Sequence, residues 1–170
     1  MKLKNKVAIV TGGGKGIGEE ISLGLAKEGA KVVVADLDKE NSSYVVKEIL
    51  KNSGEAIYVE TDVSNEASVK NLISETINRF DQIDILINNA GIRHVKKLEN
   101  HDLSDWDDMI SVNLTGPYIC CQAVIPEMKK IGKGKIINFG SIASFMGRPD
   151  RVGYVAAKSG ILGLTRALAI

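Results

Sequence analysis

The 170-residue sequence has little of what marks a secreted or metal-binding protein. Its two cysteines, Cys120 and Cys121, are neighbours in a helix-forming stretch and would point about 100° apart, so a disulfide between them is implausible. We expect buried free thiols in a reducing compartment. The two histidines, His94 and His101, do not pair with the cysteines at metal-ligand spacing, so no metal site is predicted.

The sequence also lacks an excess of one charge and a long apolar run. A net charge of +1 gives no reason to expect a polyanionic partner. Residues 1–6 are lysine-rich and lack the apolar stretch of a signal peptide. No apolar run reaches the length of a membrane span. These absences predict a cytoplasmic protein that binds neither nucleic acid nor membranes.

Apolar runs and amphipathic segments alternate along the whole chain. Strands are predicted near 7–11, 31–35, 56–60, 84–88 and 135–139, and helices near 17–28, 40–52, 66–79, 105–129 and 152–169. This alternation predicts an α/β fold with a doubly wound parallel sheet, a Rossmann-like three-layer sandwich. Because no repeat, low-complexity tract or linker interrupts it, residues 1–170 are predicted to form a single domain.

Between the first strand and the first helix lies a glycine-rich turn, Thr11-Gly12-Gly13-Gly14-Lys15-Gly16-Ile17-Gly18. A strand, a glycine turn and a helix together present backbone N–H groups and a helix N-terminus to a phosphate. Side chains at the glycine positions would block the tight turn and the approach of a pyrophosphate. The alternative is a glycine-rich turn that binds nothing.

The second predicted strand ends in Asp36, eighteen residues after Gly18. A carboxylate at this strand tip can accept hydrogen bonds from the ribose hydroxyls of adenosine, and it would repel a 2′-phosphate. Lys15 acts in the opposite sense, because a cation in the turn could contact that phosphate. We give Asp36 the greater weight and predict NAD over NADP; a solvated aspartate in a turn is the alternative.

A second group of residues lies in the C-terminal half of the chain. Tyr154 and Lys158 are four residues apart in a helical pattern, which places both side chains on one face. A neighbouring ammonium favours a phenolate, the form in which a tyrosine acts as a base. Ser141 lies thirteen residues before Tyr154.

Three further short motifs contribute to a family resemblance. They are Asp62-Val63, the Asn88-Asn89-Ala90-Gly91 run, and Asn113 in Ser111-Val112-Asn113-Leu114. With the Thr-Gly-x-x-x-Gly-x-Gly turn and the Tyr-x-x-x-Lys pair, the chain from Lys6 to its last residue resembles the short-chain dehydrogenases/reductases, in the branch with one compact domain. The resemblance implies the strand order 3-2-1-4-5, a dinucleotide-binding catalytic domain and the absence of the family's last strands. It implies a cofactor site, for NAD, made of Thr11, Gly12, Gly14, Lys15, Gly16, Ile17, Gly18, Asp36, Leu37, Asp62, Val63, Asn89, Ala90, Gly91, Tyr154 and Lys158.

The resemblance also implies a catalytic tetrad. Tyr154 would be the general acid/base, and Lys158 would favour its deprotonated form and bind the nicotinamide ribose. Ser141 would hydrogen-bond the substrate oxygen, and Asn113 would hold a water that links Lys158 to solvent. Each residue also has an ordinary structural interpretation: Ser141 as a cap, Asn113 as a buried polar helix residue, and Tyr154 as packing.

We therefore expect an NAD-dependent oxidoreductase that acts on an alcohol or carbonyl compound, such as a sugar, a polyol, a 3-oxoacyl thioester or a small ketone. The alternative is a dinucleotide-binding module without turnover. The chain stops at Ile170, inside a helical pattern, and we expect it to be a fragment of a longer polypeptide. By resemblance, the helices at 105–129 and 152–169 would form a homo-oligomer contact, in a dimer or a tetramer. The polar and apolar residues near the expected cleft are consistent with a sugar-like or small oxygenated substrate; they are Arg93, His94, Ser144, Phe145, Met146 and Arg148. For Arg93 and His94, the alternative is a role in an exposed loop.

Overall fold

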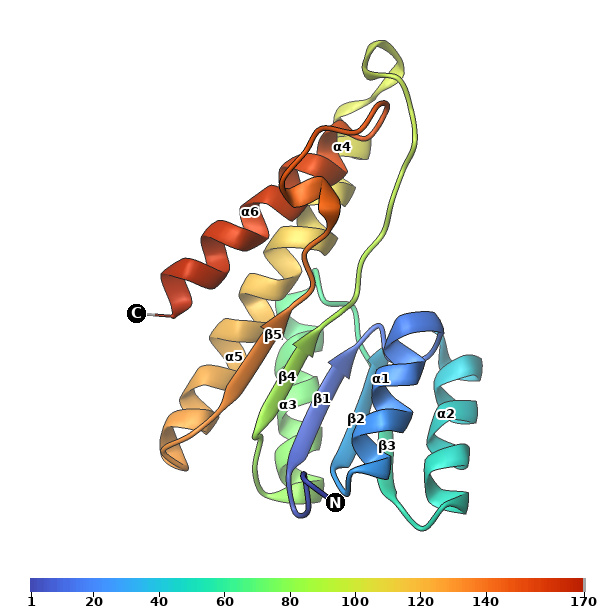
Figure 1. The fold of residues 1–170 in the computed structure, drawn as a ribbon, viewed down its shortest axis with the longest axis vertical. Helices are drawn as coiled ribbons and strands as arrows, with labels where there is room; N and C mark the ends of the chain where they lie inside the picture. Colours follow the sequence, from blue (N-terminus) through green and yellow to red (C-terminus); the bar gives the residue numbers. More distant parts are fainter. Residues whose placement is uncertain (170) are drawn as a thin grey trace.

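The computed structural model describes residues 1–169, and its centre is a parallel five-stranded sheet (Figure 1). The strands are β1 (Val7–Thr11), β2 (Lys31–Asp36), β3 (Glu55–Glu60), β4 (Ile85–Asn88) and β5 (Lys135–Asn138). Their order is β3-β2-β1-β4-β5, which confirms the predicted doubly wound sheet. The order reverses between β1 and β4, where ligands of such sheets bind beyond the carboxyl ends of the strands.

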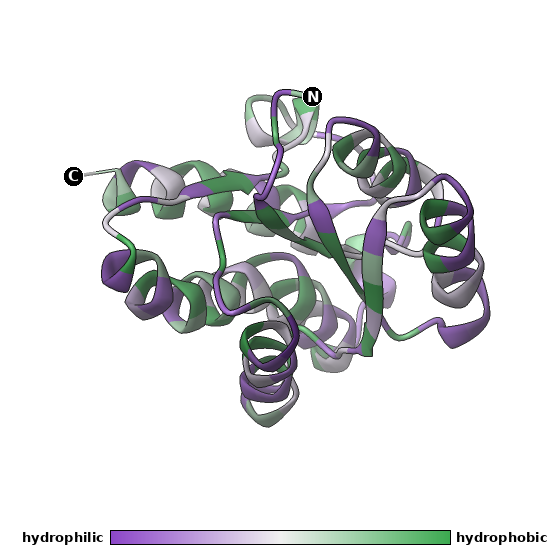
Figure 2. Ribbon diagram, turned by 90° about the horizontal axis from the view of Figure 1, so that it is seen from below, coloured by the Kyte–Doolittle hydropathy of each residue, from purple (hydrophilic) through white to green (hydrophobic). Residues whose placement is uncertain are grey.

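Helices cover both faces of the sheet (Figure 2). Helices α1 (Gly16–Lys27) and α2 (Lys39–Lys51) pack on one face, and α3 (Glu66–Phe80) and α5 (Gly116–Lys130) on the other. Helix α6 (Val152–Leu168) packs beside α4 (Leu103–Ile110) and contacts the short helix η3 (Ile142–Ser144), while η1 (Leu98–Asn100) lies in the loop after β4. The central strands are apolar along their length because they are covered on both faces; Val32, Val33 and Val34 are fully buried.

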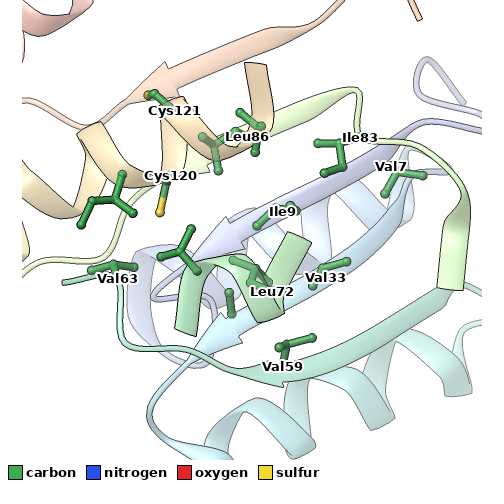
Figure 3. Close-up of a cluster of buried hydrophobic side chains, with 14 of the residues drawn as sticks. Val7, Ile9, Val33, Val59, Val63, Leu72, Ile83, Leu86, Cys120 and Cys121 are labelled. Atoms are coloured by element: carbon green, nitrogen blue, oxygen red, sulfur yellow. The ribbon is translucent and has the colours of Figure 1, made fainter. Parts of the chain in front are cut away.

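The larger apolar cluster, between the sheet and helices α3 and α5, contains both cysteines (Figure 3). Each thiol is free and 1% exposed, as predicted. Burial raises the pKa of Cys120 to about 12 and that of Cys121 to about 11. Both thiols are therefore protonated and unreactive at neutral pH.

The prediction of one unbroken helix over 105–129 was wrong. The chain forms α4, then a π-helical segment, η2 (Ser111–Thr115), and then α5. Asn113 explains the irregular turn, because its side-chain amide donates to the carbonyls of Met109 and Ile92, both at 3.0 Å. Pro117 removes one backbone donor just beyond it. Helical periodicity in the sequence does not reveal such an insertion.

At the amino ends of the strands, a buried carboxylate joins β1 to β4. Asp84, 4% exposed, accepts hydrogen bonds from the Lys6 ammonium at 2.7 Å and from the Val7 N–H at 3.0 Å. The side chain of Gln82 also donates to Asp84. Burial alone would raise the pKa of Asp84, but these hydrogen bonds outweigh it and the pKa is lowered.

Within the described residues, no helix has both the length and the apolar character needed to cross a membrane. The cytoplasmic location stays a prediction.

Candidate active site

The glycine-rich turn connects β1 to α1 in a conformation that requires glycine. Gly12 and Gly16 have positive φ angles of 61° and 57°. A Cβ atom on Gly18 would lie 1.9 Å from the Gly12 carbonyl oxygen, and one on Gly12 would lie 2.9 Å from the Ala90 Cα. The turn is thus pressed against both α1 and the segment after β4. No side chain caps the N-terminus of α1 at Lys15, so its first N–H groups are available to a phosphate.

The segment after β4 holds this turn in place. The Asn89 amide donates to the carbonyls of Thr11 and Gly12, each at 3.0 Å. The Thr11 hydroxyl accepts the N–H groups of Asn89 and Ala90, each at 3.1 Å. Two motifs separated by more than seventy residues in the sequence therefore form one hydrogen-bonded unit at the point where the strand order reverses.

Asp36, at the tip of β2, faces the glycine turn. Its carboxylate accepts the N–H of Gly14 at 3.0 Å and the N–H of Asp38 at 3.0 Å. The Lys15 ammonium lies 3.9 Å from the carboxylate of Asp38. Asp38, which sequence reasoning missed, therefore adds a second carboxylate beside the cation of the turn. Its pKa is lowered, first by the Asn41 side chain and next by the Asn41 N–H.

The pair Asp62-Val63 follows β3 at the same edge of the sheet. Asp62 accepts the N–H and the hydroxyl of Ser64, at 2.9 and 2.6 Å. Val63 is 6% exposed and belongs to the apolar core, where it contacts Gly116 closely. Leu37 and Ile17, in contrast, are 65% and 66% exposed on the open side of the turn.

Lys158 lies on α6 and is 5% exposed, with its ammonium 6.0 Å from the centre of the Tyr154 ring. It donates to the Phe139 carbonyl at 2.8 Å, and desolvation lowers its pKa. The two side chains thus share one face of the helix, as the i,i+4 spacing predicts. Phe139 was not identified as a contact of Lys158 from the sequence, because a backbone carbonyl has no residue-type signature.

Ser141 follows β5 and is the N-cap of η3. Its Oγ accepts the N–H of Ala143 at 3.1 Å. Its interpretation as a cap is therefore correct, yet a cap uses the oxygen only as an acceptor. The hydroxyl proton remains available for a hydrogen bond to a substrate oxygen.

Asn113, in the π-helical segment, is fully buried. Its amide nitrogen is used, but its Oδ1 has no hydrogen-bond partner among the described residues. A Cβ atom on Gly91 would lie 2.7 Å from this Oδ1 and 3.8 Å from the Lys158 ammonium. Gly91 therefore lets the backbone after β4 pass close to both Asn113 and Lys158, and an unpaired buried carbonyl oxygen is a position where water binds.

Two loops lie beyond the carboxyl ends of β4 and β5. The segment after β4 is joined to the segment before α6 by the Lys96 N–H, which donates to the Asp150 carbonyl at 2.9 Å. His94 lies 3.6 Å from the Asp105 carboxylate. Phe145 and Met146 are 78% and 53% exposed, whereas Ser144 is 8% exposed and does not line an open surface.

Comparisons with known proteins agree with this geometry. A family model described as "short chain dehydrogenase" matches residues 6–170. An uncharacterized oxidoreductase of Thermotoga maritima is 43% identical over 99% of this chain and 66% of its own length. A 3-oxoacyl-[acyl-carrier-protein] reductase of Synechocystis sp. is 44% identical over 98% of this chain and 68% of its own length.

A solved structure of a similar protein has the same fold. A metagenomic short-chain oxidoreductase in complex with NADP has a TM-score of 0.95 and 34% identity, over 99% of this chain and 77% of that one. The chain spans 66% and 68% of the lengths of the two curated relatives above.

Proposed function

The chain belongs to the short-chain dehydrogenase family, and from this premise we propose that it transfers a hydride between a nicotinamide dinucleotide and an alcohol or carbonyl substrate. The observation that carries the proposal is the meeting of Tyr154 and the buried Lys158 on one helix face, beside the unpaired Oδ1 of Asn113. A buried lysine beside a tyrosine is costly for stability and suits proton transfer.

The residues of the turn fit a dinucleotide. The uncapped N-terminus of α1 would hold the pyrophosphate, and the glycines leave room for it. Each carboxylate oxygen of Asp36 accepts one backbone N–H, from Gly14 or from Asp38. A carboxylate oxygen can accept a second hydrogen bond, and Asp36 would accept these from the adenosine ribose. The bound dinucleotide would supply or accept the hydride.

The chain's own residues would manage the proton. Tyr154 would give its proton to the carbonyl oxygen on reduction and remove it on oxidation. Ser141 would donate to the same oxygen and stabilise charge that develops there, because its own oxygen is held by the Ala143 N–H. Lys158 would favour the phenolate, and a water between its ammonium and Asn113 would carry the proton toward solvent.

We propose NAD as the cofactor. Asp36 would place a negative charge where NADP carries its 2′-phosphate, and a second carboxylate, that of Asp38, lies 3.9 Å from Lys15, the cation of the turn that could compensate. The metagenomic relative in complex with NADP shows that its own site accepts the phosphate. Fluorescence titration of the chain with NADH and NADPH measures the preference directly, and tighter binding of NADPH would contradict this assignment.

Turnover is tested by absorbance at 340 nm with NAD(H) or NADP(H) and a panel of sugars, polyols, small ketones and 3-oxoacyl thioesters. The matched variant is Tyr154→Phe, which keeps the ring and removes the hydroxyl. We expect it to lower kcat by a factor of about 10² to 10⁴ and to leave NADH affinity within about twofold. Equal rates for the parent and Tyr154→Phe would rule out the assigned role.

A second function, dinucleotide binding without turnover, is also proposed for the 170-residue chain, because the chain covers only 66% and 68% of the lengths of the two curated relatives. NADH binding without turnover on the whole panel would favour this function.

We further propose a homo-oligomer through α4, α5 and α6, where Leu103, Trp106 and Tyr118 are 75%, 38% and 49% exposed. Sedimentation velocity measures this directly, and a monomer at micromolar concentration would contradict it.

A further inference from the structure

The hydroxyl of Ser144 joins the turn that carries Ser141 to the helix that carries Lys158. Ser144 is the last residue of η3 and is 8% exposed. Its Oγ accepts the Ser141 N–H at 3.0 Å and donates to the Lys158 carbonyl at 2.7 Å. One buried side chain therefore forms hydrogen bonds to the backbones of two residues of the candidate active site.

These contacts hold each of the two residues at more than one point. Lys158 is bound by the Ser144 hydroxyl at its carbonyl and by the Phe139 carbonyl at its ammonium. Ser141 accepts the Ser144 N–H at 2.9 Å through its carbonyl, in addition to donating its own N–H to the Ser144 hydroxyl. The segment 139–144 thus fixes both the backbone of Ser141 and the two ends of Lys158.

A role as a helix cap explains only half of this arrangement. In the reciprocal cap of η3, the Ser144 side chain needs only to accept the Ser141 N–H. Its proton instead goes to a carbonyl fourteen residues away on α6, at the shorter of the two distances. That second hydrogen bond adds nothing to the cap and links α6 to the turn that carries Ser141, in addition to the contact of Lys158 with Phe139.

We propose that Ser144 is a positioning residue that sets the distance between the Ser141 hydroxyl and the Lys158 ammonium. The inference rests on the proposed oxidoreductase function. Its physical reason is that a proton donor misplaced by about 1 Å can lower a catalysed rate by about 10²-fold. Ser144 touches neither substrate nor cofactor in this role and acts through Ser141 and Lys158.

The first arm of the test measures the link itself by amide hydrogen exchange at Ser141. Four proteins are compared: the parent chain, Ser144→Ala, Ser144→Thr (which keeps the hydroxyl) and Ser159→Ala. Ser159 is the matched control, because it is a serine on α6 whose hydroxyl contacts the Ser144 carbonyl at 3.5 Å without bridging to Ser141. We expect Ser144→Ala alone to speed exchange at Ser141 about tenfold or more, with β1 amides unchanged.

The second arm measures kcat and KM for the carbonyl compound of the panel that gives the highest rate with NADH. Ser144→Ala should lower kcat about 10- to 100-fold with the KM for NADH within about twofold, and Ser144→Thr should recover most of the rate. In a Ser141→Ala background, the same substitution should cost less than about threefold, because the hydroxyl whose distance to Lys158 is set by Ser144 is absent. A merely structural role would lower activity equally in both backgrounds.

Two results overturn the proposal. One is unchanged exchange at Ser141 in Ser144→Ala. The other is a loss of kcat in the double variant that equals the product of the losses from Ser141→Ala and Ser144→Ala alone. Failure of the proposed function looks different. It appears as no turnover by the parent chain on the entire panel, and the exchange measurement then still decides whether the Ser144 hydroxyl holds Ser141.

Discussion

Replacing Asp84 with alanine should destabilise the fold by about 3 kcal/mol. The carboxylate is 4% exposed and binds the Lys6 ammonium, the Val7 N–H and the Gln82 side chain. Removing one partner of a buried ion pair costs about 3–5 kcal/mol, of which an unpaired buried N–H such as that of Val7 accounts for about 1–3 kcal/mol. The Lys6 side chain is 32% exposed and regains water, which favours the lower end of that range.

Equilibrium unfolding in urea measures this change. With a slope of about 2 kcal/mol per molar urea, the midpoint should fall by about 1.5 M at pH 7. Glu75→Ala is the control, because Glu75 is an exposed carboxylate on α3 and its loss should change stability by no more than about 0.5 kcal/mol. A midpoint for Asp84→Ala within about 0.3 M of the parent would refute the reasoning.

The pH dependence of the unfolding free energy gives a second test of the role of Asp84. Because the pKa of Asp84 is lowered in the folded state, its contribution is complete above the ordinary value of 3.8. The contribution is lost as the pH falls through the lowered folded-state pKa. The stability difference between the parent and Asp84→Ala should therefore be constant from pH 5 to 8 and shrink below about pH 4.

Three further predictions concern the site and the core. Asp36→Asn should weaken NADH binding about tenfold and reduce the proposed preference for NADH over NADPH, since the charge proposed to face the ribose 2′ position would be lost; titration of both dinucleotides checks this. Gly91→Ala should lower kcat about tenfold or more and also destabilise the fold by about 1–3 kcal/mol, because its Cβ would lie 2.7 Å from the Oδ1 of the buried Asn113 and would displace that side chain; equal kcat would argue against a water there. Iodoacetamide at pH 8 should modify neither Cys120 nor Cys121 in the native chain and both in urea, as their pKa values of about 12 and 11 require; mass spectrometry counts the adducts.

Much of the fold could be predicted because residue type and spacing carry it directly. Val32 to Val34 form a β-branched apolar run that favours a strand covered on both faces, and the glycines of the turn have backbone angles and contacts that other residues would not tolerate. The order of the strands came from the family resemblance and was confirmed by the structure.

Other features could not be predicted from a sequence pattern. The π-helical segment depends on an amide of Asn113 that reaches the carbonyl of Ile92 in another loop. The contact of Lys158 with the Phe139 carbonyl and the two hydrogen bonds of Ser144 also join residues that are distant in sequence. Such contacts use backbone groups, which every residue has, so the sequence alone gives no sign of them.

The π-helical turn has a consequence for insertions and deletions. A π segment contains one residue more than the α-helical turn that it replaces, so α5 is rotated by about 100° from the phase that α4 would impose. Deleting one residue inside a regular helix usually shifts every following side chain off its face. Here, deleting Val112 or Leu114 would instead merge α4 and α5 into one uniform helix, and that more regular molecule would move the Asn113 amide away from Ile92.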